Sequence, residues 1–212
     1  MKYFGAIDQG TTSSRFIVFN SDGNIVEEYQ KEIKQYLPNA ISVEHDPIEI
    51  FESVKECILE VNQKFSINQL DSIGITNQRE TTLAWSKSSG KPLHNALVWL
   101  DTRTQDICDD LKQIKELSNE FSKTGLPIAT YFSISKILWL LRNVKDVQEA
   151  KSNNDLCFGT IDSWLLFKFT GKHATDVTNA SRTLLMDLNS LEWIDYIVEK
   201  LDIPRESFAS IK

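Results

Sequence analysis

Short runs of apolar residues alternate with polar turns at the N-terminal end of the chain. Residues 2–8 and 15–20 are mostly apolar, residues 24–33 mix apolar and charged positions, and Asp22-Gly23 separates the last two segments. Asp-Gly between alternating runs is a strong signal for a tight hairpin turn. These runs therefore predict three strands joined by short turns, which form an antiparallel meander.

A helix with readable ends is predicted next. Asp46 suits the N-cap, Pro47 suits the first helical position, and Glu49 stands three residues after the cap. Apolar residues then recur at spacings of three and four, which predicts one buried face. That expected face consists of Ile48, Phe51, Val54, Ile58, Val61 and Phe65.

The remaining chain alternates between expected strands and helices. The expected strands lie at residues 70–76, 82–86, 96–99 and 156–159, and residues 183–187 are expected to be extended. The expected helices lie around residues 107–117, 134–141, 164–169 and 192–201. A meander followed by this alternation predicts an α/β fold with a mixed sheet flanked by helices.

Charge and composition narrow the function classes. The net charge is −7, so the chain offers no field that would gather nucleic acid, and a phosphate site must rest on local donors. The longest apolar run, residues 137–141, is too short to cross a bilayer, so no membrane insertion is expected. Asp8 comes too early for a signal peptide, and the three cysteines are too scattered for a zinc site or a disulfide framework. A cytoplasmic protein is expected.

The first candidate site is the string DQGTTSSR at residues 8–15. A turn of glycine and small hydroxyl residues exposes backbone N–H groups that can hold phosphate oxygens. Asp8 suits Mg²⁺, which prefers carboxylates and keeps much of its water, and Arg15 adds a fixed cation. The alternative is a plain polar hairpin, because glycine and serine are common in turns. Neither a Walker phosphate loop nor a GxGxxG motif occurs.

Further candidates would suit a small polyol. Arg79 and Glu80 follow the apolar strand at residues 70–76, and ligands often bind at the carboxyl ends of strands. The guanidinium of an arginine donates to hydroxyl oxygens, and the carboxylate of a glutamate accepts from hydroxyl hydrogens. The alternative for this pair is a surface ion pair. Trp99 would form a wall for the carbon face of the ligand or would belong to the core, and Tyr131 offers a hydroxyl just before a helix.

Six strings together resemble a known family, in order along nearly the whole chain. They are DQGTTSSR at residues 8–15, VEHDP at 43–47, GITNQRETT at 74–82, VWLDTRT at 98–104, FGTIDSWLL at 158–166 and TNASRTLL at 178–185. The chain resembles the glycerol kinases of the FGGY carbohydrate-kinase family. Residues 131–143 also match the first signature of that wider family.

The resemblance implies the N-terminal domain of such a kinase over residues 1–212, with a ribonuclease-H-like, actin-like fold. It implies ATP-dependent phosphorylation of glycerol to sn-glycerol 3-phosphate, with ATP and Mg²⁺. The implied roles are glycerol hydrogen bonding for Arg79, Glu80 and Tyr131, an aromatic wall for Trp99, contact with the transferred phosphoryl group for Thr11, Thr12 and Ser13, a nucleotide-phosphate contact for Arg15, and Mg²⁺ association for Asp8.

The resemblance places the catalytic base, an aspartate beside a glutamine, beyond residue 212, and the adenine-binding lobe further on. Asp187, Asp195 and Asp202 do not stand in the matching motif. The N-terminal domain is thus expected to be slightly short at its C-terminal end and the C-terminal nucleotide-binding domain to be absent. The chain alone is expected not to be a competent kinase. It is also expected to form homo-oligomers or aggregates through apolar surface that the other lobe would cover.

Three other readings stay open. The chain is either this kinase domain or a non-catalytic module that binds a polyol or a protein partner. A kinase of another polyol or a pentulose would share the family but not the pair Arg79-Glu80 together with Trp99, which resembles the glycerol branch. An actin-like or chaperone ATPase would share only the hairpin at residues 8–15 and would have no use for the polyol residues.

Overall fold

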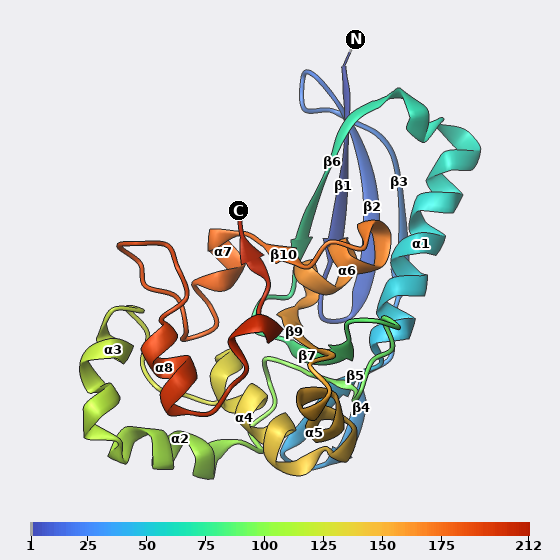
Figure 1. Cartoon of the computed structure of the whole chain (residues 1–212). Helices are drawn as coiled ribbons and strands as arrows, with labels where there is room; N and C mark the ends of the chain where they lie inside the picture. Colours follow the sequence, from blue (N-terminus) through green and yellow to red (C-terminus); the bar gives the residue numbers. More distant parts are fainter. Residues whose placement is uncertain (1) are drawn as a thin grey trace. The chain divides into compact units, whose positions relative to one another are not determined.

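The computed structural model describes residues 2–212 and divides the chain into two compact units (Figure 1). Unit 1 holds the residues up to Gln35 together with His45–Gln78, and unit 2 holds Tyr36–Glu44 together with Arg79–Lys212. In the described part of the chain, no helix combines the length and the apolar character needed to cross a membrane.

Unit 1 is built on a four-stranded mixed sheet in the order β3-β2-β1-β6. Its strands are β1 (Tyr3–Gln9), β2 (Ser13–Asn20), β3 (Ile25–Glu32) and β6 (Leu70–Asn77). β1, β2 and β3 pair antiparallel, whereas β6 runs parallel to β1. The predicted meander is confirmed, and Gly23 turns it at a positive φ of 80° that glycine adopts without steric cost. β2 begins at Ser13, two residues earlier than predicted.

Helix α1 (Pro47–Lys64) lies along the β1-β2-β3 part of this sheet (Figure 1). Asp46 is its N-cap, as predicted, because its side chain accepts the N–H of Ile48 at 2.8 Å. The predicted buried face is only partly right. Val54 and Val61 are buried, but Ile48 is 40% exposed. The residues that complete the buried face are Pro47, Ile50, Ser53 and Cys57.

The buried face of α1 includes a polar contact with β2. Ser53 Oγ lies 2.8 Å from Ser14 Oγ, and Cys57 Sγ donates to the Ser14 carbonyl oxygen at 3.3 Å. Ser53 Oγ also donates to the Ile50 carbonyl oxygen at 2.8 Å, so the buried hydroxyls of this contact are satisfied.

Unit 2 is built on a five-stranded sheet in the order β4-β5-β8-β7-β9. It also contains a two-stranded sheet of β10 and β11. The strands are β4 (Tyr36–Asn39), β5 (Ser42–His45), β7 (Thr82–Ser86), β8 (Ala96–Leu97), β9 (Leu156–Thr160), β10 (Ala174–Thr175) and β11 (Ser210–Ile211). The helices are α2 (Gln105–Gln113), α3 (Ser118–Ser122), α4 (Ser133–Asn143), α5 (Lys145–Ser152), α6 (Ile161–Thr170), α7 (Val177–Ala180) and α8 (Asp195–Lys200). Helices and sheet share one apolar core.

Several predicted elements of unit 2 differ from the structure. The helix predicted over residues 107–117 ends at Ile114, whose ψ of 83° is not helical, and a short 3₁₀ turn and α3 follow. Residues 183–187 are not a strand, because Leu184 has a positive φ of 65° and only Met186 forms a bridge, with Trp193. β4, β5 and α5 were not predicted, and β8 and α8 are shorter than expected.

Candidate functional site

The hairpin between β1 and β2 carries the predicted phosphate-contacting residues of unit 1. Asp8 lies directly opposite Arg15 in the antiparallel register, so both side chains project from the same face of the sheet. Arg15 Nη2 donates to Gln30 Oε1 on β3 at 2.8 Å, and its Nη1 lies 3.7 Å from Glu28. The guanidinium is therefore held beside the hairpin by the neighbouring strand.

The hydroxyl residues of this hairpin divide between the two faces of the sheet. Ser13 Oγ accepts from Gln30 Nε2 at 2.9 Å and lies on the face of Arg15, whereas Ser14 is buried against α1. Gly10 donates its N–H to the Ser13 carbonyl oxygen at 2.8 Å, so this N–H closes the turn. Thr11 and Thr12 therefore lie on the turn and Ser13 begins β2, whereas Ser14 belongs to the core. The contact of Thr11, Thr12 and Ser13 with a phosphoryl group stays a prediction.

Neutral polar side chains of unit 1 form hydrogen bonds with the hairpin. The Gln78 amide Nε2 lies 3.0 Å from Gln9 Oε1, 3.2 Å from the Gly10 carbonyl oxygen and 3.1 Å from His45 Nδ1. Burial lowers the pKa of His45 to about 4, so its imidazole is neutral at pH 7. The Gln78 amide and His45 Nδ1 share a hydrogen bond whose direction depends on the tautomer of the ring.

In unit 2, Glu80 is a buried carboxylate with a specific partner. Its backbone is left-handed, with φ of 61°, and the residue is only 2% exposed. Arg182 Nε donates to Glu80 Oε1 at 2.6 Å, across 102 positions of sequence. Arg79 is exposed, whereas Glu80 is buried and pairs with Arg182, so Glu80 is not half of the surface ion pair considered as an alternative. The buried charge is compensated from α7's C-terminal side instead.

The structure brings Trp99 and Tyr131 together. Their ring centroids lie 5.6 Å apart in an edge-to-face arrangement, and Tyr131 makes a second edge contact with Phe132 at 5.3 Å. The Arg182 guanidinium lies 5.1 Å from the centre of the Phe132 ring. These contacts connect the aromatic pair to the residue that holds Glu80.

A backbone contact connects the same groups from the other side. The Trp99 N–H donates to Thr81 Oγ1 at 3.2 Å, and Thr81 follows Glu80 in the chain. Glu80, Trp99 and Tyr131 are therefore the sequence-predicted residues that unit 2 brings together, and we call them the polyol cluster. A buried carboxylate beside an aromatic wall can accept hydroxyl hydrogens while the ring covers carbon atoms.

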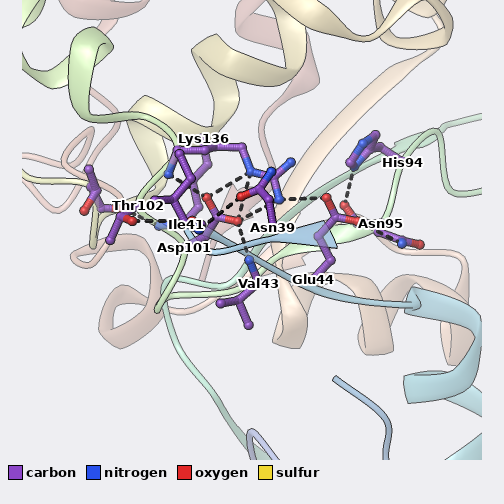
Figure 2. Close-up of polar contacts among 11 residues, drawn as sticks. Asn39, Ile41, Val43, Glu44, His94, Asn95, Asp101, Thr102 and Lys136 are labelled. Carbon is purple, nitrogen blue, oxygen red and sulfur yellow. Dashed lines mark hydrogen bonds and ion pairs between the residues drawn. The ribbon is translucent and has the colours of Figure 1, made fainter. Parts of the chain in front are cut away.

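Sequence reasoning missed a cluster of buried charges that includes Glu44 and Asp101 (Figure 2). Arg103 binds Asp101 and Glu44 with its Nη2 at 2.7 Å from each carboxylate, and Asp101 also accepts the Val43 N–H at 2.8 Å. Burial opposes the charge of Arg103, but its hydrogen bonds with Asp101 and Glu44 raise its pKa. The Arg103 guanidinium also lies 4.7 Å from the centre of the Trp139 ring. This ion cluster ties β5 to the segment after Trp99.

The sequence held a partial signal for these residues. Glu44 stands in VEHDP, Arg103 in VWLDTRT and Arg182 in TNASRTLL, three of the strings that carry the family resemblance. Their type and position were visible, but their pairing across long stretches of chain was not.

Two expectations concern the base and the metal. Asp187 accepts the Asn189 N–H at 2.7 Å, Asp202 binds Lys151 at 2.6 Å, and Asp195 binds Arg205, so each of the three has a structural partner. Among residues 2–212, no group of three or more His, Cys, Asp or Glu side chains is placed to hold a metal. Asp8 alone suits only an ion that keeps most of its water, as Mg²⁺ does.

Comparisons with known proteins agree with this architecture. The family "FGGY family of carbohydrate kinases, N-terminal domain" matches residues 3–212. The chain belongs to the FGGY family of carbohydrate kinases, and the predicted α/β class is confirmed.

Its curated relatives point to one branch of that family. A "Glycerol kinase" of Borrelia garinii subsp. bavariensis is 50% identical over 216 residues, which are 100% of this chain and 43% of the relative. A "Glycerol kinase" of Arabidopsis thaliana is 49% identical over 99% of this chain and 42% of the relative. The solved structure of Plasmodium falciparum glycerol kinase with ADP has a TM-score of 0.91 at 37% identity, over 100% of this chain and 43% of that chain. The chain therefore spans less than half the length of the relatives that it matches.

Proposed function

We propose that the polyol cluster of unit 2 binds glycerol, and that the chain serves as the glycerol-binding domain in ATP-dependent phosphorylation of glycerol to sn-glycerol 3-phosphate. The observation that carries the proposal is the buried Glu80 carboxylate, held at 2.6 Å by Arg182 beside the Trp99–Tyr131 pair. The similarity to glycerol kinases supports it.

Each residue then has a defined task toward glycerol. The Glu80 carboxylate accepts hydroxyl hydrogens, and its oxygen that Arg182 leaves open is the natural acceptor. Arg79, exposed next to it, donates to hydroxyl oxygens, and Tyr131 adds one hydroxyl. Trp99 covers the carbon chain. Because these side chains are fixed before the ligand arrives, much of their contribution to phosphoryl transfer is positional.

The proposal extends to the nucleotide through the hairpin of unit 1. Thr11, Thr12 and Ser13 would contact the transferred phosphoryl group, Arg15 a nucleotide phosphate, and Asp8 a hydrated Mg²⁺. Bound Mg²⁺-ATP would supply the phosphoryl group and a cation that offsets its spreading negative charge. The ADP in the similar Plasmodium falciparum structure supports nucleotide use.

The direct test is glycerol binding by the 212-residue chain, measured by calorimetry and by NMR shifts of the Trp99 indole N–H. Glu80→Ala should weaken binding by about tenfold or more, which corresponds to about 1.4 kcal/mol. Glu116→Gln, an exposed carboxylate paired with Lys200, is the matched control and should change nothing. Tighter binding of a pentulose or of gluconate than of glycerol would overturn the choice of substrate.

The catalytic part needs a separate assay. Glycerol-dependent ADP release with Mg²⁺-ATP would be measured for the wild-type chain and for Glu80→Ala, which controls for contaminating kinase. Turnover that depends on Glu80 would overturn the expectation that this chain alone is not competent. No turnover alongside specific glycerol binding would support a role as the substrate-binding part.

A further inference from the structure

Lys136 on α4 is a fully buried lysine that binds main-chain oxygen atoms. Its exposed fraction is 0%. Its Nζ donates to the carbonyl oxygen of Thr130 at 2.6 Å and to that of Tyr131 at 2.9 Å, and it lies 3.5 Å from that of Phe132. Burying an ammonium group costs several kcal/mol unless its N–H groups are satisfied. One side chain thus gathers the carbonyl oxygens of three successive residues.

The geometry of α4 explains how Lys136 reaches these atoms. α4 begins at Ser133, so Lys136 lies at the end of the first turn, and helical side chains lean toward the N-terminal end of their helix. The segment that it holds is the one directly before the helix. Phe132, the N-cap residue, is extended with ψ of 160° and has no side-chain capping bond. Lys136 therefore takes over the ordering of this entry segment.

The inward carbonyl oxygens leave the Tyr131 side chain on the outside. Tyr131 is 37% exposed and meets the Trp99 ring at 5.6 Å. If its carbonyl oxygen were released, the peptide could rotate and the ring would lose its place beside Trp99. The polyol cluster depends on this position of the Tyr131 ring.

Two carboxylates favour the charged form of Lys136. Burial lowers the pKa of Lys136 to about 7, whereas the negative charges of Asp101 and Glu80 oppose this shift. Figure 2 shows the Lys136 side chain beside Asp101, whose oxygens are already bound by Arg103 and by the Val43 N–H. The carbonyl oxygens of the entry segment are thus the direct partners of the ammonium group.

We propose that Lys136 is a positioning residue that holds the entry segment of α4, residues 130–132, and thereby fixes the Tyr131 ring against Trp99 for ligand binding. The role of Tyr131 as a glycerol ligand rests on the proposed function, but the ring placement does not. Lys136 is not expected to touch the substrate.

The test compares Lys136→Met with Leu140→Ala in the 212-residue chain at pH 6. Methionine keeps the length of the side chain and removes the ammonium group, whereas Leu140 is a fully buried residue in the second half of α4. The first readout is the NMR cross-relaxation between the Trp99 and Tyr131 rings, and the second is the dissociation constant for glycerol. Urea unfolding first identifies a temperature at which both variants are folded, and both readouts are then measured at that temperature.

Loss of the ring–ring signal in Lys136→Met but not in Leu140→Ala supports the proposal, together with a glycerol affinity lower by about tenfold in Lys136→Met alone. Retention of the signal in Lys136→Met overturns it, whatever happens to glycerol binding. If the signal is lost while the wild-type chain binds no glycerol, the positioning role stands and the proposed function fails. A Tyr131→Phe variant, which keeps the ring and removes the hydroxyl, should keep the signal and weaken glycerol binding only.

Discussion

In unit 1 the hairpin is braced by Gln9, Gln78 and His45, all neutral at pH 7. In unit 2 partly or fully buried basic side chains take this role: Arg182 binds Glu80, Lys136 binds the Tyr131 carbonyl oxygen, and Arg103 binds Asp101 and Glu44 in the segment after Trp99. Neutral hydrogen bonds each contribute about 1 kcal/mol, so losing one weakens the brace in proportion. A buried ion that loses its partner leaves an uncompensated charge, which costs much more. The two regions should therefore respond differently to substitution, salt and pH.

The largest effect is expected at Arg103. Arg103→Met leaves Asp101 and Glu44 buried without their shared cation and should lower the free energy of unfolding by about 3–5 kcal/mol. Urea unfolding measures this change. Arg142→Met is the matched control, because the Arg142–Asp110 pair is exposed and should contribute less than about 1 kcal/mol. Equal losses in the two variants would show that burial does not decide how much an ion pair of unit 2 contributes to stability.

The next effect is a pH dependence that His45 gives to unit 1. Its pKa falls from 6.5 in the unfolded chain to about 4 in the folded chain. Between these two values the unfolded chain binds more protons, so stability is fully present above pH 6.5 and is lost as the pH falls toward 4. From pH 7 to pH 4.5 this loss should be about 2–3 kcal/mol.

The comparison that isolates His45 is a His45→Asn variant, whose unfolding free energy should fall less between pH 7 and pH 4.5. Urea unfolding at both pH values measures the difference. Parallel curves for the wild type and the variant would show that other groups carry the acid sensitivity, and that the neutral brace of unit 1 contributes no pH dependence.

A third effect concerns the brace of Glu80. Arg182→Met removes the donor to a buried carboxylate and should cost about 1–3 kcal/mol of stability. It should also weaken glycerol binding by about tenfold. Calorimetry and urea unfolding measure both. Arg205→Met, which breaks an exposed pair with Asp195, is the control. Unchanged glycerol binding in Arg182→Met would show that this ion pair does not support ligand binding by the polyol cluster.

The smallest effect distinguishes two adjacent serines of the hairpin. Ser14→Ala leaves the buried Ser53 hydroxyl without this contact and should cost about 1 kcal/mol. Ser13→Ala should cost less stability but weaken the binding of Mg²⁺-ATP, because Ser13 lies on the face of Arg15. Urea unfolding and nucleotide titration measure the two changes. A larger stability loss in Ser13→Ala would mean that the division of the hydroxyls between the two faces is wrong.

The candidate residues were visible in the sequence, but several of their partners were not. Arg79, Glu80, Trp99 and Tyr131 stand in recognisable strings, and the structure joins the last three in one cluster. The partner of Glu80 lies 102 positions away, so no local pattern indicates it. The apolar spacing in α1 predicted a helix correctly but its buried face only in part: Val54 and Val61 are buried and Ile48 is not, whereas Ser53 packs against Ser14 of a distant strand.

The sequence by itself determined the N-terminal meander, the start of α1 at its Asp46 cap and the family, because turn chemistry, capping and strings of adjacent residues act over a few positions. Only the tertiary structure decided that Ser14 is core while Ser13 is not, that Glu80 binds Arg182, and that Lys136 holds the segment of Tyr131. Burial and ion pairing depend on groups that come from distant parts of the chain, so they exist only once the chain has folded.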